Sequence, residues 1–168
     1  MKIAPEYIRI IQGIHNKGFL HRDVKPENML RGVSGSTYWL IDYGLAKKYI
    51  REGGEHIPRI INKPVVGTPR FVSRHVHAGS QSARRDDMES LGYVFIYLAK
   101  GALPWNTKKS DTRKEKLKFI AETKTNTTTK ELCKDLPNVF ELYMNTVREL
   151  EFKETPTYDI LADFFESV

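Results

Sequence analysis

Residues 21–28 read HRDVKPEN and residues 42–44 read DYG, and these two stretches are the most informative part of the sequence. Between them, two short apolar runs flank the turn-rich residues 32–36, which is the pattern of a small β-hairpin. Two acidic groups, a lysine and an asparagine thus lie on and beside this hairpin. The sequence therefore predicts a charged functional centre at the hairpin.

These residue types suit the transfer of a phosphoryl group, which depends on positioning and charge neutralisation more than on covalent chemistry. Asp23 is the candidate proton acceptor for an attacking hydroxyl, and Lys25 is the candidate cation for the γ-phosphate. Asn28 and Asp42 carry the hard oxygen atoms that Mg²⁺ prefers as ligands. The predicted chemistry is therefore phosphoryl transfer that uses a bound magnesium ion.

Motifs along nearly the whole chain resemble the casein kinase I family of protein kinases. The two stretches quoted above are similar to the catalytic loop and the metal-binding motif of protein kinases in general. The further matching motifs are DYGLAKKY (42–49), HIP (56–58), GTPR (67–70), Gly79, RRDDMESLGY (84–93) and LPW (103–105). Residues 72–75 read VSRH where most protein kinases have Ala-Pro-Glu, and the casein kinase I family also departs from that motif. The resemblance implies a protein serine/threonine kinase with ATP and Mg²⁺ as cofactors.

The resemblance also implies roles for individual residues. Thr68 matches the residue that braces the catalytic aspartate and lysine, and is therefore a further candidate catalytic residue. Leu30 and Ile41 match apolar residues beside the adenine and the metal-binding motif, although ordinary packing within the hairpin explains them as well. Nucleotide binding is expected from Lys25, Asn28, Leu30, Ile41 and Asp42, with Asn28 and Asp42 as metal ligands. Structural support is expected from His21, Arg22, Gly44 and Asp87.

The positive charge predicts acidic or phosphorylated protein substrates. The formal net charge is +6. Arg70 and Lys116 match the basic site that, in the casein kinase I family, receives a phosphorylated or acidic residue upstream of the target serine or threonine. Lys116 belongs to a basic cluster made of Lys108, Lys109, Arg113, Lys114, Lys116 and Lys118. A solvated helix face explains most of this cluster equally well, and nuclear targeting is a third interpretation.

Apolar periodicity predicts a mainly α chain with one small β-hairpin. Helices are expected at residues 3–14, 87–100, 112–123, 128–134, 137–150 and 157–166. Residues 50–83 are expected to be a long irregular segment, and no other convincing strands are predicted. With 168 residues, of which 40% are hydrophobic, the chain is expected to form a single domain over residues 1–168.

The N-terminal lobe of a kinase is not recognisable in the sequence. That lobe carries a glycine-rich loop, a strand lysine and a helix glutamate. The glycines before the catalytic loop are Gly13 and Gly18, and no Val-Ala-x-Lys run is present. We therefore expect a protein-kinase-like fold with the C-terminal lobe and without the N-terminal β lobe. We also expect little phosphotransfer by this chain alone, and association through the exposed lobe interface.

Three functions remain compatible with the sequence. The first is an incomplete copy of a casein kinase I-like enzyme, and the second is a noncatalytic phosphopeptide-binding or scaffold module that uses Arg70 and Lys116. The third, nucleic-acid binding, is disfavoured because aromatic residues do not alternate with the basic cluster. No signal peptide or membrane span is recognisable, and the single cysteine, Cys133, is compatible with a reducing compartment. An intracellular location, cytoplasmic or nuclear, is therefore expected.

Overall fold

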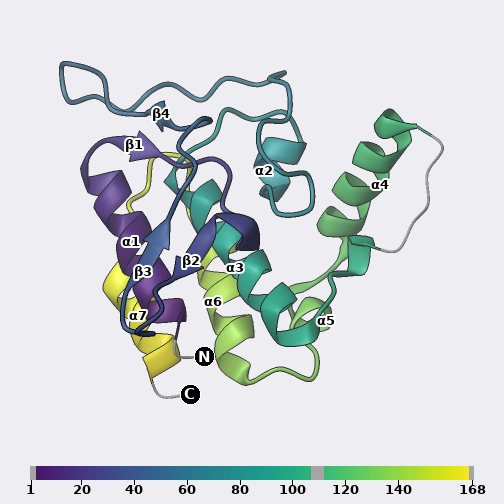
Figure 1. Cartoon of the computed structure of the whole chain (residues 1–168). Coiled ribbons are helices and arrows are strands. Elements are labelled where there is room, and N and C mark those ends of the chain that lie inside the picture. The colour runs from purple at the N-terminus through teal and green to yellow at the C-terminus, as the bar shows by residue number, and fades with distance from the viewer. Residues whose placement is uncertain (1–2, 107–111, 167–168) are drawn as a thin grey trace.

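The computed structural model describes residues 3–106 and 112–166, and most of its elements are helices (Figure 1). The α-helices are α1 (Ala4–Asn16), α2 (Arg74–His77), α3 (Arg84–Lys100), α4 (Arg113–Asn126), α5 (Thr129–Leu132), α6 (Asn138–Glu149) and α7 (Tyr158–Glu166). Two 3₁₀ turns accompany them, η1 (Pro26–Asn28) and η2 (Pro104–Asn106). The predicted fold class, mainly α with a small β-hairpin, is confirmed. Among the described helices, none combines the length and the apolar character needed to cross a membrane.

Two small antiparallel sheets border residues 21–28, which resemble the catalytic loop of protein kinases and are called the catalytic loop below. The predicted hairpin is present as β2 (Met29–Arg31) and β3 (Tyr38–Leu40). A second pair, β1 (Phe19–Leu20) and β4 (Lys47–Lys48), shows that the prediction of no further strands was wrong. Strands of two residues are too short to show the alternation that identifies a strand in sequence. Their pairing brings the chain before the catalytic loop next to the chain after the DYG motif.

The long segment of residues 50–83 is largely irregular, as predicted, but it contains the short helix α2. Ser73 begins this helix, since its Oγ accepts a hydrogen bond from the backbone N–H of Val76 (3.0 Å). The segment crosses the upper side of the molecule in the view of Figure 1 before it enters α3. The hydroxyl of Ser73 donates to Asp86 Oδ1 (2.5 Å), which ties the segment to the first turn of α3.

Helix α3 lies in the centre of the core, and its residues from Arg85 to Ile96 are buried. On one side it packs against α6, while α1 packs against both α3 and α7. The ring of Phe165 in α7 joins these layers, because its centroid lies 5.4 Å from the rings of both Phe95 in α3 and Phe140 in α6. The buried central helix provides a fixed base for side chains that reach the catalytic loop.

Two apolar residues of the helices, Leu98 in α3 and Ile160 in α7, do not face the core. Leu98 is 45% exposed because the last turn of α3, residues 98–100, emerges from the core. Ile160 is 52% exposed because the buried side of α7 follows Leu161 and Phe165, which are one helical turn apart. Both residues lie where a helix end or a helix edge leaves the packed interior.

Candidate active site

Asp87 of α3 holds the start of the catalytic loop in place. Its Oδ2 accepts a hydrogen bond from the backbone N–H of His21, and its Oδ1 accepts one from the backbone N–H of Arg22, both at 2.8 Å. Arg22 has a φ of 67°, a left-handed conformation that is costly for a residue other than glycine. The two hydrogen bonds to Asp87 therefore stabilise a strained turn directly before Asp23.

A buried histidine from α1 and a tyrosine from α7 extend this arrangement. His15 Nε2 lies 2.9 Å from Asp87 Oδ2, and His15 Nδ1 lies 2.6 Å from the hydroxyl of Tyr158. Burial raises the pKa of Asp87, but the hydrogen bonds from His15 and from the backbone outweigh burial and lower the pKa below its ordinary value. Asp87 is thus ionised at neutral pH, and its carboxylate accepts hydrogen bonds from three N–H groups.

The predicted support residues of the loop contact the segment that contains the DYG motif. His21 Nε2 pairs with the backbone carbonyl of Ile41 (3.1 Å), and Arg22 Nε donates to the carbonyl of Leu45 (2.6 Å). The backbone N–H of Gly44 donates to Asp42 Oδ1 (3.2 Å). The catalytic loop and residues 41–45 are therefore joined by side-chain hydrogen bonds that span about twenty positions of sequence.

The structure brings Asp23, Lys25 and Thr68 together. Asp23 Oδ1 accepts hydrogen bonds from the backbone N–H (2.9 Å) and the hydroxyl (2.7 Å) of Thr68, and Asp23 Oδ2 accepts one from Lys25 Nζ (2.6 Å). Burial raises the pKa of Asp23, whereas the hydrogen bonds from Lys25 and Thr68 lower it, and the net result lies below the ordinary value. The hydrogen bond to Asp23 raises the pKa of Lys25. The site therefore holds a carboxylate beside a cation.

Asn28 and Asp42 lie near the same end of the β2–β3 hairpin. The backbone N–H of Ile41 donates to the carbonyl of Asn28 (2.9 Å), and Asp42 follows Ile41 directly. Asn28 is buried, and its side-chain N–H group donates to the carbonyl of Asp23 (2.9 Å), which leaves its side-chain oxygen for another partner. Asp42 is exposed and has a φ of 64°. One amide oxygen and one accessible carboxylate fit a magnesium ion, which commonly keeps waters and binds few protein ligands.

Leu30 and Ile41 are exposed rather than packed inside the hairpin. Leu30 is 44% exposed and Ile41 is 39% exposed, and the neighbouring Trp39 and Tyr43 are about half exposed. These side chains give the hairpin side of the molecule an apolar surface. That surface can receive the flat face of an aromatic ring, as the predicted adenine contact requires.

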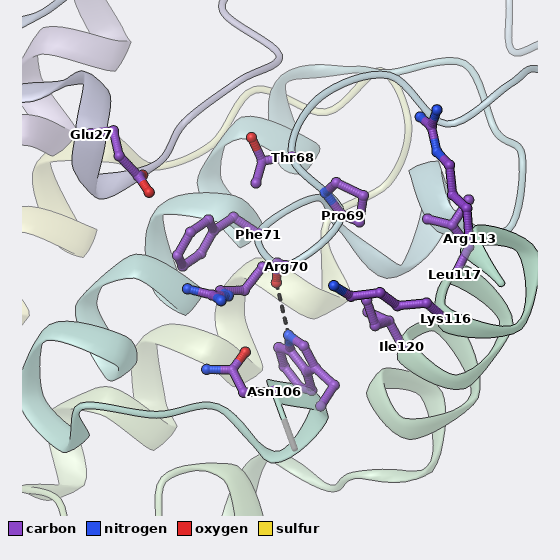
Figure 2. A pocket seen from close by; sticks show the side chains of 11 residues that line it. Glu27, Thr68, Pro69, Arg70, Phe71, Asn106, Arg113, Lys116, Leu117 and Ile120 are labelled. Atoms are coloured by element: carbon purple, nitrogen blue, oxygen red, sulfur yellow. Dashed lines mark hydrogen bonds between the residues drawn. The ribbon is translucent and has the colours of Figure 1, made fainter. Parts of the chain in front are cut away.

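A cavity of about 440 Å³ lies beside the catalytic loop and brings together Arg70 and Lys116 (Figure 2). Its lining comes from the catalytic loop, the segment after Thr68, the turn η2 and helix α4. The lining residues are Glu27, Thr68, Pro69, Arg70, Phe71, Trp105, Asn106, Arg113, Lys116, Leu117 and Ile120. Three cations and one carboxylate in this lining make the cavity predominantly positive.

The basic cluster divides into residues with different surroundings. Arg113 and Lys116 line the cavity, whereas Lys118 pairs with Glu122 of the same helix at 3.7 Å. Lys114 is exposed, and Lys108 and Lys109 lie outside the described residues. Lys114 and Lys118 therefore fit the interpretation of a solvated helix face, whereas Arg113 and Lys116 contribute positive charge to the cavity.

A family model described as a protein kinase domain matches residues 2–158 of this chain. The chain belongs to the protein kinase family. The match places the HRDVKPEN and DYG stretches within a kinase domain and agrees with the helical lobe described above.

Protein kinases generally use ATP and Mg²⁺, and the residues of this kinase lobe fit that pair. Bound Mg²⁺ neutralises phosphate charge during phosphoryl transfer. Asn28 and Asp42 would hold the metal, and Lys25 would face the phosphates. Within the described residues, no cluster of three or more His, Cys, Asp or Glu side chains forms a separate metal site. At the hairpin end, the amide oxygen of Asn28 and the carboxylate of Asp42 are available as oxygen ligands for a cation.

The sequence assigned no role to four residues that shape this kinase site, although one of them, Trp105, belongs to the LPW motif. His15 and Tyr158 contact Asp87 directly or through each other, while Lys124 and Trp105 bind backbone carbonyls of the segment that lines the cavity. The signal for His15 and Lys124 was present, because each lies on an apolar helical stripe, His15 after Ile8 and Ile11, and Lys124 after Ile120. A polar residue on such a stripe needs a buried partner, which the sequence does not identify.

Proposed function

We propose that this chain carries the catalytic loop and the substrate-binding side of a serine/threonine kinase of casein kinase I type. Such an enzyme transfers the γ-phosphoryl group of ATP to serine or threonine in acidic or already phosphorylated proteins. One observation supports this most directly. Thr68 hydrogen bonds Asp23, and Arg70, two residues later, lines the positive cavity together with Lys116.

This arrangement suits a peptide that the chain binds at two points. The target hydroxyl would lie at Asp23, whose carboxylate accepts its proton, and a phosphate or carboxylate upstream in the peptide would lie between Arg70 and Lys116. Lys25, Asn28 and Asp42 would serve the nucleotide and its metal, with Leu30 and Ile41 beside the adenine. The guanidinium of Arg70 also lies over the ring of Tyr97 at 5.5 Å, which limits its freedom before a peptide arrives.

Binding of a phosphopeptide tests the substrate class. We expect a serine peptide with an upstream phosphoserine to bind the wild-type chain more tightly than its unphosphorylated form. Replacement of Arg70 by alanine should weaken phosphopeptide binding by about tenfold or more, because hydrogen bonds to charged groups contribute about 1.5–3 kcal/mol. Fluorescence anisotropy of the labelled peptides measures both affinities.

Lys118→Ala is the matched control for that experiment. It removes the same charge from the basic cluster, but Lys118 pairs with Glu122 and does not line the cavity. Its affinity should stay close to that of the wild type. Equal binding of the two peptides by the wild type would refute recognition of phosphate at Arg70 and Lys116.

Phosphotransfer separates a catalytic from a noncatalytic role. We expect slow transfer from ATP by the 168 residues on their own, since the described residues contain no glycine-rich loop to cover the phosphates. Transfer of labelled phosphate to the same peptide measures the rate, with Asp23→Asn as the control. Rapid, Asp23-dependent turnover would contradict the expectation of a slow chain. Phosphopeptide binding that survives Asp42→Ala but is lost in Arg70→Ala would fit the noncatalytic binding module.

A further inference from the structure

Lys124 is a buried lysine that contacts the segment lining the cavity. Its side chain is completely buried, although α4 is otherwise a largely exposed helix. Burial lowers the pKa of Lys124 to about 7, against a smaller opposing effect of Glu89. A buried amine is costly unless it is hydrogen bonded. The contacts that Lys124 makes therefore indicate what its burial achieves.

Those contacts lead to the segment that follows Thr68. Lys124 Nζ donates to the backbone carbonyls of Pro69 (2.8 Å) and Val72 (2.5 Å). The same Nζ lies 5.1 Å from the ring centroids of both Tyr93 and Trp105. Lys124 is thus enclosed by two carbonyl oxygens and two aromatic rings.

Trp105 adds a third attachment of the same segment. Its Nε1 donates to the backbone carbonyl of Arg70 at 2.8 Å, the hydrogen bond drawn in Figure 2. The carbonyls of Pro69, Arg70 and Val72 are therefore all bound by side chains from outside the segment. The segment is also closed on itself, since the backbone N–H of Val72 donates to the carbonyl of Thr68 (3.0 Å).

Helix α4 connects Lys116 to the segment that carries Arg70, and these two residues form the proposed phosphate site. Lys116 and Lys124 lie two turns apart on this helix, one at the cavity and the other beneath the segment that carries Arg70. Through Lys124 the helix is tied to the backbone on both sides of Arg70. The separation of Arg70 and Lys116 is thereby set by backbone contacts as well as by the two side chains themselves.

We propose that Lys124, together with Trp105, is a positioning residue that sets the spacing of Arg70 and Lys116 for a phosphoserine dianion. Neither residue needs to touch the phosphate. This inference rests on the proposed function of the cavity. Its physical reason is preorganisation, because two cations already at the right separation bind a dianion without the cost of ordering the segment that carries one of them.

The test measures how strongly each variant prefers the phosphorylated peptide over the unphosphorylated one. Lys124→Met keeps a long apolar side chain and removes the donors, and we expect it to weaken phosphopeptide binding by about tenfold. Trp105→Phe keeps an aromatic ring and removes the Arg70 hydrogen bond, and it should weaken binding by about three- to tenfold. Binding of the unphosphorylated peptide should not change. Lys118→Met is the charge-matched control and should bind like the wild type.

A double-mutant cycle with Arg70 distinguishes positioning from general damage. In an Arg70→Ala chain, Lys124→Met and Trp105→Phe should cause no further loss of phosphopeptide affinity, because the residue that they position is absent. A loss of the same size in both backgrounds would overturn the inference and indicate a merely structural role. If Lys124→Met does not fold, as circular dichroism would reveal, Trp105→Phe decides by the same criterion.

Failure of the inference and failure of the proposed function give different results. If the wild type prefers the phosphorylated peptide and both variants keep that preference unchanged, the inference is overturned and the proposed function stands. If the wild type shows no preference, the proposed phosphate site is refuted, and the inference is refuted with it.

Discussion

Replacement of Asp87 by alanine lowers the free energy of unfolding by about 3–5 kcal/mol. Three hydrogen bonds are lost at once, from the backbone of His21 and Arg22 and from the imidazole of His15. The backbone N–H groups cannot find new protein partners inside the core, and Arg22 loses the contact that stabilises its positive φ. Urea unfolding followed by tryptophan fluorescence measures the change.

Lowering the pH should reduce the difference in the free energy of unfolding between the wild type and Asp87→Ala. The pKa of Asp87 is lower in the folded chain than in the unfolded chain, so its contribution is fully present above the unfolded value of 3.8. The contribution is lost as the pH falls through the folded pKa. The exposed Asp159 of α7 is the control, since Asp159→Ala should change stability by less than about 0.5 kcal/mol. A loss from Asp87→Ala below about 1 kcal/mol at pH 7 would contradict the central role of this carboxylate.

Replacement of Gly67 by alanine destabilises the chain by about 2–5 kcal/mol and detaches Thr68 from Asp23. Gly67 has a φ of 100°, which L-residues rarely adopt. A Cβ at this position would overlap the backbone carbonyl of Arg22 and would lie 2.9 Å from Val72 Cγ1. Because a backbone carbonyl held by its own loop cannot move aside easily, residues 67–68 must shift. Amide hydrogen exchange at Thr68 should rise together with the loss of stability.

Gly54→Ala separates the cost of the positive φ from the cost of the close contact that a Cβ would make. Gly54 also has a positive φ, 81°, but no atom lies within 4 Å of a Cβ at this position. Its replacement should cost about 1–2 kcal/mol from the backbone conformation alone. Equal losses for the two variants would show that close approach to the catalytic loop contributes nothing at Gly67.

Local patterns predicted most of the framework. The helix of residues 3–14 is α1, and Gly18 and Gly101 lie just beyond the ends of α1 and α3 with the positive φ expected of glycines that end a helix. Turn residues between two apolar runs predicted the β2–β3 hairpin. Such patterns are readable because helix and hairpin geometry depend on residues within a few positions of one another.

Local patterns failed where the partner lies far away in sequence. The two-residue strands β1 and β4 exist because they pair with each other, and neither has a pattern of its own. Lys124 was not singled out, yet it is fully buried, because its partners are carbonyls more than fifty positions earlier. Backbone carbonyls occur at every residue, so sequence cannot reveal which of them a lysine will bind.

The sequence by itself determined the helical framework, the kinase motifs and the residue types available for chemistry. The tertiary structure decided which of these side chains meet. Asp87 reaches the catalytic loop from a buried helix, Thr68 reaches Asp23, and Arg70 and Lys116 line one cavity across 46 positions of sequence, from 70 to 116. The physical reason is that the composition of a site depends on how helices pack, and packing depends on the shape of the whole core rather than on any short stretch of residues.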